Sequence, residues 1–425
     1  MPRRSDFGDK YGAKWTAAGV GIAVAALLAA GLWAFVPAAP RPARPPALEV
    51  RGDRLLVDGS PAGIRGVFYN PWLSTPGPDG QVPSFRHDIV EQDLDDISNI
   101  GANAIELFEA PASVVVDAAR HDLVTLYGFD IDWSDTSRAA FERGADAIVS
   151  SVRALGGHAG IAMWLLGRDV PARAVGALGR LEVEHRLNLL ASRVKAIDPA
   201  RPVAHASGPA TAELELSGFD IACFDLAAPS EAGAPAPPDA GRYVREVIAP
   251  RAHGRPLLFA GLCSRGAGGE AEQASELAGV WGEIARLTAG GVIFEWADGA
   301  WTGPAHAEPG LAGPGGMLAR RDLAGPAAAT AGSGLVRADR QPKPALAAVR
   351  RMWRAEMRAT NAWLALGGLS LLALMLFGSR RRRLPSRIAL ALFCTLNWAS
   401  LGPCHPAGAA MGSGGAGSAG ERAAP

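Results

Sequence analysis

The chain has 425 residues, a length that allows one large domain or two ordinary ones, and 48% of them are hydrophobic, which is enough for a sizeable core. Its 42 Lys and Arg residues balance its 42 Asp and Glu residues, so no net charge attracts nucleic acid or an acidic partner. We therefore expect no nucleic-acid partner.

The first element along the chain is an uncharged apolar run at residues 15–36. As a helix it reaches about 33 Å, which crosses a hydrocarbon core of about 30 Å. A cleaved signal peptide is the alternative, with small residues near 36–39 as its cleavage site. Because the run is long for a signal peptide, we favour an uncleaved transmembrane anchor. Basic residues in segment 1–14 then place that segment in the cytoplasm, and 37–47 forms a Pro-rich linker.

The next region, residues 48–355, starts with a short hairpin that turns at Asp58-Gly59 and continues as apolar runs alternating with helical patterns. The apolar runs, each typical of a buried strand, are 64–71, 102–109, 122–131, 158–167, 201–207, 219–226, 255–262 and 290–298. The clearest helical patterns are 85–101, 177–198, 271–290 and 342–353.

This order predicts an α/β fold, a (β/α)8 TIM barrel, because each of the strands is followed by a helix or a helix-sized connection. A doubly wound open sheet is the alternative, but such sheets usually have fewer strands. The weakest link is 208–218, where the fifth helix would be very short, and 227–240 and 302–340 have the composition of irregular loops.

A second uncharged run follows the barrel at residues 359–379, and four arginines at 380–383 come directly after it. The positive-inside rule places these arginines in the cytoplasm, as it does the N-terminus. We therefore expect a transmembrane helix on each side of the barrel, which would lie on the periplasmic side of a bacterial inner membrane. The remainder, 380–425, holds the basic cluster, an apolar segment too short for a span and a low-complexity tail.

Cysteines and histidines give few signals. Cys223 and Cys263 could form a disulfide in an oxidising compartment or remain two separate thiols, and both interpretations stay open. No CxxC, HxH or HExxH spacing occurs in the barrel region, so we expect neither a metal site nor a cofactor. Asp93, Asp95 and Asp96 share one predicted helix, and we expect them on its solvated face.

Carboxylates and tryptophans collect at the carboxyl ends of the predicted strands, where barrels of this type carry their chemistry. Paired carboxylates suit glycoside hydrolysis, and tryptophan offers a flat apolar surface to a sugar ring, although some of these tryptophans belong to the core. The residues expected to bind a polysaccharide or oligosaccharide are Tyr69, Asn70, Trp72, Glu106, Asp130, Asp132, Trp133, Trp164, Arg168, Trp296, Asp298 and Trp301.

Several of these stretches resemble the TIM-barrel domain of clan-A-type glycoside hydrolases, above all the family 2 catalytic domain and the bacterial glucanosyltransferase-like proteins. The resemblance covers roughly 48–355 and is carried by IRGVFYNPW, GANAIELFE, LYGFDIDWSD, GGHAGIAMWLLGRD, RPLLFAGL and GGVIFEWADGAW.

The resemblance implies an acid/base in an Asn-Glu pair that ends the fourth strand and a nucleophilic Glu that ends the seventh. Here the first pair is Arg168-Asp169, and the nucleophile position is Gly261. Asp169 keeps a carboxylate but withdraws it by one methylene, and retaining hydrolysis needs two carboxyl groups about 5–5.5 Å apart. Glycine has no side chain that could attack a sugar.

Three interpretations remain open. The barrel could be a glycosidase or transglycosylase for an envelope or exported polysaccharide, β-glucan-like, in which Asp169 works with a relocated carboxylate such as Glu295. It could be an inactive barrel that still binds glycan. It could also be a membrane-tethered partner of a polysaccharide synthase or exporter. The missing nucleophile argues against the first, and the retained carboxylates and tryptophans argue against a pure scaffold.

Overall fold

The computed structural model describes residues 48–57, 59–61, 63–71, 86–208, 211–225, 240–263, 269–298 and 332–359. The chain divides into two compact units, Ala38–Ala355 and a second one made of Met1–Pro37 with Glu356–Pro425, and the fold below is that of the first. The predicted anchors at 15–36 and 359–379 lie outside the described residues, apart from Ala359. Within the described residues, no helix combines the length and the hydropathy that crossing a membrane requires.

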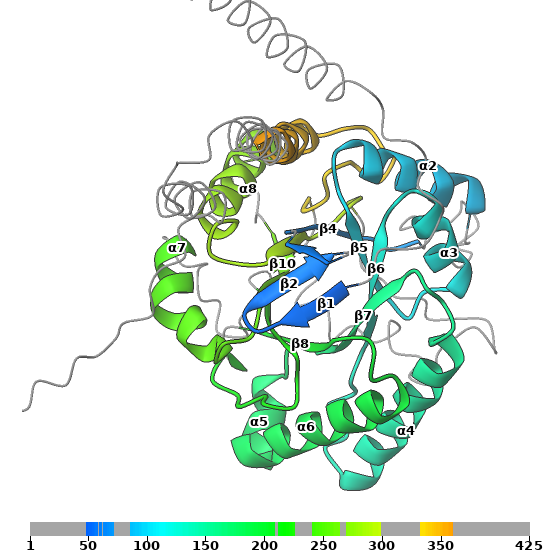
Figure 1. The fold of residues 1–425 in the computed structure, drawn as a ribbon, viewed down its shortest axis with the longest axis vertical. Coiled ribbons are helices and arrows are strands. Elements are labelled where there is room, and N and C mark those ends of the chain that lie inside the picture. Colours follow the sequence, from blue (N-terminus) through cyan, green and yellow to red (C-terminus); the bar gives the residue numbers. More distant parts are fainter. Residues whose placement is uncertain are drawn as a thin grey trace, which may run out of the picture. The chain divides into compact units, whose positions relative to one another are not determined.

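The centre of the fold is a closed barrel of parallel strands in the order β10-β11-β4-β5-β6-β7-β8-β9 (Figure 1). Each strand overlaps one of the predicted runs, so the TIM barrel is confirmed and the open sheet is excluded. The strands are β4 (Ile64–Phe68), β5 (Ala104–Phe108), β6 (Val124–Phe129), β7 (Ile161–Arg168), β8 (Val203–Ser207), β9 (Ile221–Asp225), β10 (Leu257–Leu262) and β11 (Gly290–Ile293).

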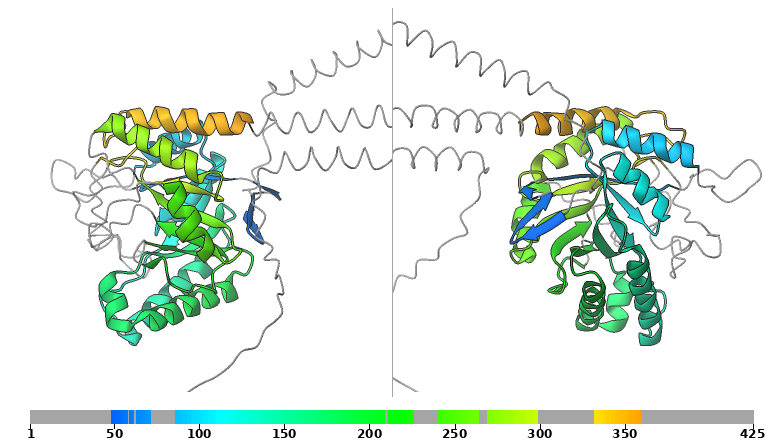
Figure 2. Two further views of the ribbon diagram at one scale, coloured as in Figure 1. Left: turned by 90° about the vertical axis from the view of Figure 1, so that its left-hand side faces the viewer. Right: turned by 45° about the vertical axis from the view of Figure 1, so that its right-hand side comes forward.

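Helices surround the barrel on its outside (Figures 1 and 2). The described residues between β8 and β9 form turns instead of a helix, in line with the short connection expected there. The helices are α2 (His87–Asn99), α3 (Ala112–Arg120), α4 (Arg138–Leu155), α5 (Ala172–Leu178), α6 (Arg180–Ile197), α7 (Ala240–Tyr243), which continues in irregular turns to Ala252, and α8 (Glu270–Ile284), with a last helix at 344–359.

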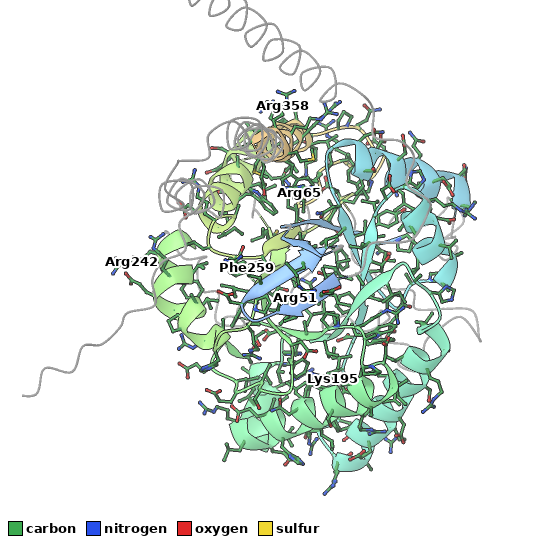
Figure 3. The ribbon with its side chains drawn as sticks, viewed as in Figure 1. Arg51, Arg65, Lys195, Arg242, Phe259 and Arg358 are labelled. Atoms are coloured by element: carbon green, nitrogen blue, oxygen red, sulfur yellow. The ribbon has the colours of Figure 1, made fainter. Side chains whose placement is uncertain are left out.

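Two apolar clusters form the core because successive side chains of a strand point to opposite faces. The outer cluster lies between strands and helices and includes Leu94 of α2 and Phe259 of β10. The inner cluster fills the barrel and includes Met163 and Cys223. Figure 3 shows Phe259 nearer the barrel axis than Lys195, which lies on the peripheral helix α6.

A small antiparallel sheet covers one end of the barrel (Figure 2). It consists of β1 (Leu48–Arg51), β2 (Arg54–Val57) and β3 (Ser60–Pro61), in that order. Leu48 and Leu55 are buried and belong to the inner cluster. Because β3 ends just before β4 begins, this sheet closes the amino-terminal end of the barrel and leaves the opposite end for chemistry.

Asp93 corrects one expectation about α2. We expected its carboxylate on the solvated face, but Asp93 is only 1% exposed. The Tyr69 hydroxyl donates to its Oδ2 at 3.1 Å, and Arg340 Nη2 donates to the same atom at 3.1 Å. The helical periodicity was sound, but it could not show that Arg340, more than two hundred positions away, packs on this face of the helix.

Candidate functional site

Arg168 lies at the carboxyl end of β7, and its guanidinium reaches three other strands. It donates to Asp225 Oδ2 of β9 at 2.6 Å and to the Ala260 carbonyl of β10 at 2.8 Å. It also donates to Glu106 Oε1 of β5. One cation therefore ties four strands together at the position where the resemblance implies an asparagine.

Three phenylalanine rings surround the same guanidinium. Arg168 Cζ lies 5.5 Å from the ring centroids of Phe68 and Phe108 and 5.7 Å from that of Phe294. Cation–π attraction is strongest in such desolvated positions. We call Arg168, Glu106, Asp225 and these rings the Arg168 cluster. These mostly buried charged and aromatic side chains fill the end of the barrel where a substrate pocket is expected.

The electrostatics of the Arg168 cluster follow from burial. Burial raises the pKa of Glu106 to about 7, with Asp225 acting in the same direction and Arg168 opposing both. Burial alone would lower the pKa of Arg168, but Glu106 and Asp225 outweigh it and raise that pKa above its usual value. Glu106 Oε2 is buried and accepts no hydrogen bond from the described residues. Arg168 therefore stays charged, and Glu106 holds its proton unusually well for a carboxyl group.

Gly261 lies where the resemblance implies a nucleophile, and the Arg168 cluster fills the space beside it. A Cβ built on Gly261 would overlap Asp225 Oδ1 and lie 2.9 Å from Arg168 Nη1. A glutamate cannot be placed there while Asp225 and Arg168 keep their ion pair. The position lacks a nucleophile, and it also lacks room for one.

Asp169 lies at the predicted acid/base position but is engaged with the β8 connection. Its Oδ1 accepts from Thr211 Oγ1 at 2.6 Å and from the Gly208 amide at 3.1 Å. A Cβ on Gly208 would come within 2.5 Å of this carboxylate, so a glycine is needed there. Burial raises the pKa of Asp169, while the Thr211 bond opposes the shift. This carboxylate serves a loop contact in the structure.

Glu295 and Asp298, after β11, are also held by protein groups. Glu295 is 3% exposed, and Ser333 Oγ donates to its Oε1 at 3.2 Å. Asp298 accepts from Lys343 Nζ at 3.0 Å and from the Gly334 amide at 2.7 Å. Both residues therefore anchor the segment that leads into the last helix.

Asp130, after β6, is another carboxyl group with a raised pKa at this end of the barrel. Burial and the neighbouring Glu109 carboxylate raise its pKa to about 8. The Ile131 amide donates to its Oδ1 at 2.8 Å. Asp130 and Asp132 are both half-buried, and Asp132 accepts from the Ser134 amide at 2.8 Å. Strand ends β5 and β6 thus present a carboxylate-rich surface.

Most of the expected aromatic platform lies in the core. Trp133, Trp164 and Trp296 all belong to the outer cluster and are nearly or fully buried. Trp164 Nε1 donates to Asp198 Oδ2 at 3.0 Å on the helix side of the barrel. Tyr69 likewise points to α2, and burial raises its pKa. A sugar does not reach these rings, whereas Asn70 is half-buried at the end of β4. Trp72 and Trp301 lie outside the described residues.

Sequence reasoning missed the roles of Asp225 and of the three phenylalanines. Their signal was present, since Phe68, Phe108 and Phe294 occupy matching positions near the ends of their strands. The sequence signal that these rings surround a cation is Arg168, which stands where the resemblance implies an asparagine. Cys223 and Cys263 are not joined in a disulfide, so the second of the two open interpretations, two separate thiols, is the one found.

No protein-family model and no curated protein matches the chain. Among solved structures, a family 2 β-galacturonidase from Eisenbergiella tayi bound to galacturonate is similar with a TM-score of 0.54 and 15% identity, over 73% of this chain and 54% of that one. A β-glucuronidase from Faecalibacterium prausnitzii has a TM-score of 0.54 and 15% identity, over 73% of this chain and 52% of that one. A β-D-glucuronidase from Dictyoglomus thermophilum has a TM-score of 0.52 and 14% identity, over 73% of this chain and 53% of that one.

The chain therefore spans about half the length of these glycosidases. What it shares with them is the barrel. The likeness confirms the TIM-barrel fold that the order of elements predicts.

Proposed function

We propose that this chain is a membrane-anchored, glycan-binding barrel that does not hydrolyse glycosides. The observation that carries the proposal is the state of Gly261, whose missing side chain is replaced by the Asp225–Arg168 ion pair. Retaining hydrolysis needs a carboxylate at that point and a second one about 5–5.5 Å away. The second position, Asp169, is occupied with Thr211 and Gly208.

The ligand that we propose is an uncharged polysaccharide, β-glucan-like in character. The solved relatives include enzymes bound to galacturonate or D-glucuronic acid, which are anionic sugars. Here Glu109 and Asp132 make the strand ends acidic, and Arg168 is already paired. Carboxylates accept hydrogen bonds from sugar hydroxyls but repel uronates, so neutral sugars fit better.

The proposed location is the bacterial inner membrane, with the barrel on the extracytoplasmic side. The support is the sequence, in which uncharged runs at 15–36 and 359–379 flank the barrel and basic residues follow the second run. In this location the barrel would hold an exported polysaccharide for a neighbouring synthase or exporter. The alternative is a scaffold role, in which the barrel binds the synthase or exporter but no glycan.

The test uses the full-length chain, purified in detergent, with β-glucans and with uronate-containing polysaccharides. We expect retardation in β-glucan affinity gels without new reducing ends. Replacing Asn70 and Asp132 with alanine should weaken retardation, whereas the exposed Leu181→Ala control should not. No retardation by any glycan would leave the scaffold role, and new reducing ends would contradict the proposal.

A second candidate function, hydrolysis with a relocated acid, is favoured by Asp130 alone. A pKa of about 8 keeps this carboxyl protonated at neutral pH, as a general acid requires. In that case Asp130→Asn should abolish product formation, and the wild-type rate should fall as pH rises through about 8. Asp169→Asn and Glu295→Gln would identify its partner.

A further inference from the structure

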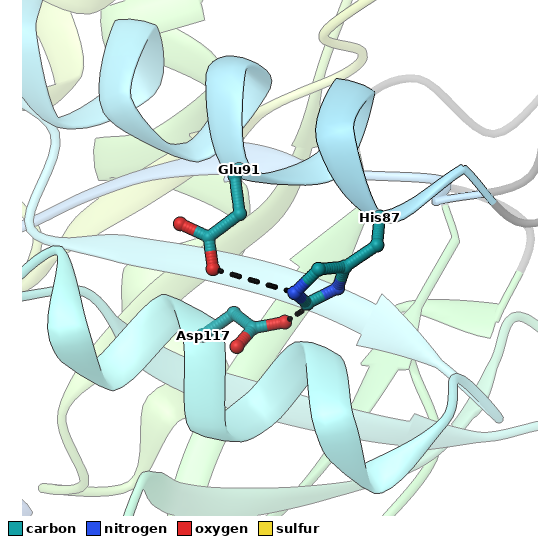
Figure 4. Close-up of side chains that lie close together, drawn as sticks. All are labelled: His87, Glu91 and Asp117. Carbon is teal, nitrogen blue, oxygen red and sulfur yellow. Dashed lines mark ion pairs between the residues drawn. The ribbon is translucent and has the colours of Figure 1, made fainter.

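Two neighbouring helices bring a histidine and two carboxylates together on the outside of the barrel (Figure 4). His87 and Glu91 are one turn apart on α2, a spacing that places them on the same side of the helix. Asp117 comes from α3. One ligand atom from each residue can be chosen so that all three lie within 4.8 Å of one another.

Asp117 is the buried member of this group. Its side chain is 3% exposed, and Oδ2 accepts no hydrogen bond from the described residues. This oxygen faces His87 Nδ1 at 3.4 Å. A buried carboxylate oxygen without a hydrogen bond is unfavourable, and the ion pair with Arg120 engages the other oxygen of Asp117.

Residues at the edge hold the other oxygen of each carboxylate. Arg120 Nη1 donates to Asp117 Oδ1 at 2.8 Å, and His121 Nε2 lies 2.9 Å from Glu91 Oε2. The remaining oxygens, Asp117 Oδ2 and Glu91 Oε1, face the His87 ring. Outer hydrogen bonds that orient ligand carboxylates are a regular feature of metal sites.

We propose that His87, Glu91 and Asp117 bind a divalent transition-metal ion of the Zn²⁺ class between α2 and α3. An imidazole with two carboxylates suits Zn²⁺, and water completes the tetrahedron, whereas Mg²⁺ and Ca²⁺ prefer oxygen ligands alone. Ligand atoms around Zn²⁺ lie about 3.3 Å apart when its bonds are about 2.0 Å long. The distance of 3.4 Å between His87 Nδ1 and Asp117 Oδ2 is close to that value. Glu91 Oε1 lies 3.8 Å from the other ring nitrogen, Nε2, so a shared ion requires the exposed His87 ring to turn.

The expected affinity is moderate, because Arg120 Nη1 lies 3.8 Å from Glu91 Oε1 and offsets part of the negative charge. The bound ion would fasten the first turn of α2 to α3. The sequence offered no sign of this, since its ligands come from two helices and do not form a known spacing.

The test uses the tag-free, chelator-treated full-length protein with Co²⁺, Zn²⁺ and Mg²⁺ as probes. We expect one equivalent of Co²⁺ to bind with visible absorption typical of tetrahedral nitrogen and oxygen ligands, Zn²⁺ to displace it and raise the Tm, and Mg²⁺ to do neither. His87→Ala should weaken Co²⁺ binding at least tenfold while retaining the fold by circular dichroism, because His87 is more than half exposed.

His185→Ala is the matched control, since His185 is an exposed histidine on α6, outside this group. Its Co²⁺ affinity should equal that of the wild type. Equal binding by His87→Ala, or no Co²⁺ binding by the wild type, would overturn the proposal and reduce the group to an ion-pair network. Thiolate absorption from Cys263 or Cys223 would likewise contradict it.

Discussion

At the scale of single residues, Arg168 is the most consequential side chain in the barrel. Its cation neutralises two buried carboxylates, so removing it leaves both without compensation. We expect Arg168→Met to lower the free energy of unfolding by about 3–5 kcal/mol. Urea denaturation measures this loss.

The control for Arg168→Met is a triple variant that also carries Glu106→Gln and Asp225→Asn. Because it removes all three charges together, it should lose clearly less stability than the single variant. Equal losses would mean that shape, not charge, makes Arg168 important. Arg242→Met, in an exposed ion pair with Glu246, should change stability by less than about 0.5 kcal/mol.

Gly261 has its own prediction. Even one added methyl group meets Asp225 Oδ1, so Gly261→Ala should cost about 2 kcal/mol of stability through overpacking. Gly144→Ala is the matched control, because Gly144 lies within α4 with no atom near its Cβ position. That change should be neutral or stabilising by up to about 1 kcal/mol. A tolerated Gly261→Ala would show that Asp225 moves easily and would weaken the proposed loss of catalysis.

At the scale of elements, the sheet β1-β2-β3 completes the inner core. Leu55 is 3% exposed and packs with residues inside the barrel. We expect Leu55→Ala to cost about 2–4 kcal/mol, because it leaves a cavity that the sheet cannot fill. Thermal unfolding measures the loss, and Leu181→Ala, at a leucine that is 76% exposed, should leave the Tm unchanged.

The sequence allowed every barrel strand to be found, because buried parallel strands are continuous apolar runs bounded by turns. It did not allow side-chain direction to be read at the ends of strands. In β7 the pairing with β8 shifts register between Leu165 and Arg168, and Gly167 has a φ of 82°. Strict alternation from the inward Leu165 would turn Arg168 outward, yet its guanidinium lies inside. The bulge therefore decides the site, and no apolar pattern encodes it.

The tryptophans show that hydropathy does not reveal which face of a strand a side chain lies on. Trp164 and Leu165 are neighbours, and both are apolar, so hydropathy could not tell which one faces the barrel axis. Trp164 joins the outer cluster, and Leu165 joins the inner one. The carboxylate roles were hidden for a related reason, since Thr211 and Ser333 are far in sequence from Asp169 and Glu295.

At the scale of the whole molecule, stability should depend on pH through His205. This side chain is 1% exposed, and burial lowers its pKa to about 4, from a value near 6.5 in the unfolded chain. The unfolded state therefore binds a proton first as pH falls. The stability that neutral His205 contributes is present above about pH 6.5 and is lost as pH falls toward 4.

His205→Asn tests this dependence, because an asparagine amide can still donate to the Leu166 carbonyl, as Nδ1 does at 2.7 Å. We expect the variant to lose less stability than the wild type between pH 6.5 and 4 in urea denaturation. His253→Asn changes an exposed histidine and should follow the wild-type curve. Parallel curves for all three proteins would refute the role of His205.

The overlap between Asp225 and position 261 also bears on how such a barrel could evolve. One nucleotide change converts some glycine codons to glutamate codons, so a glutamate at position 261 is nominally a single mutation away. A glutamate at position 261 would collide with Asp225 of the ion pair. Removing Arg168 first would leave the buried carboxylates of Glu106 and Asp225 without a cation. We expect each intermediate to be less stable than the present protein, so that selection for folding opposes a glutamate at position 261. The Arg168 cluster therefore opposes the appearance of a glutamate at position 261 in descendants of this barrel.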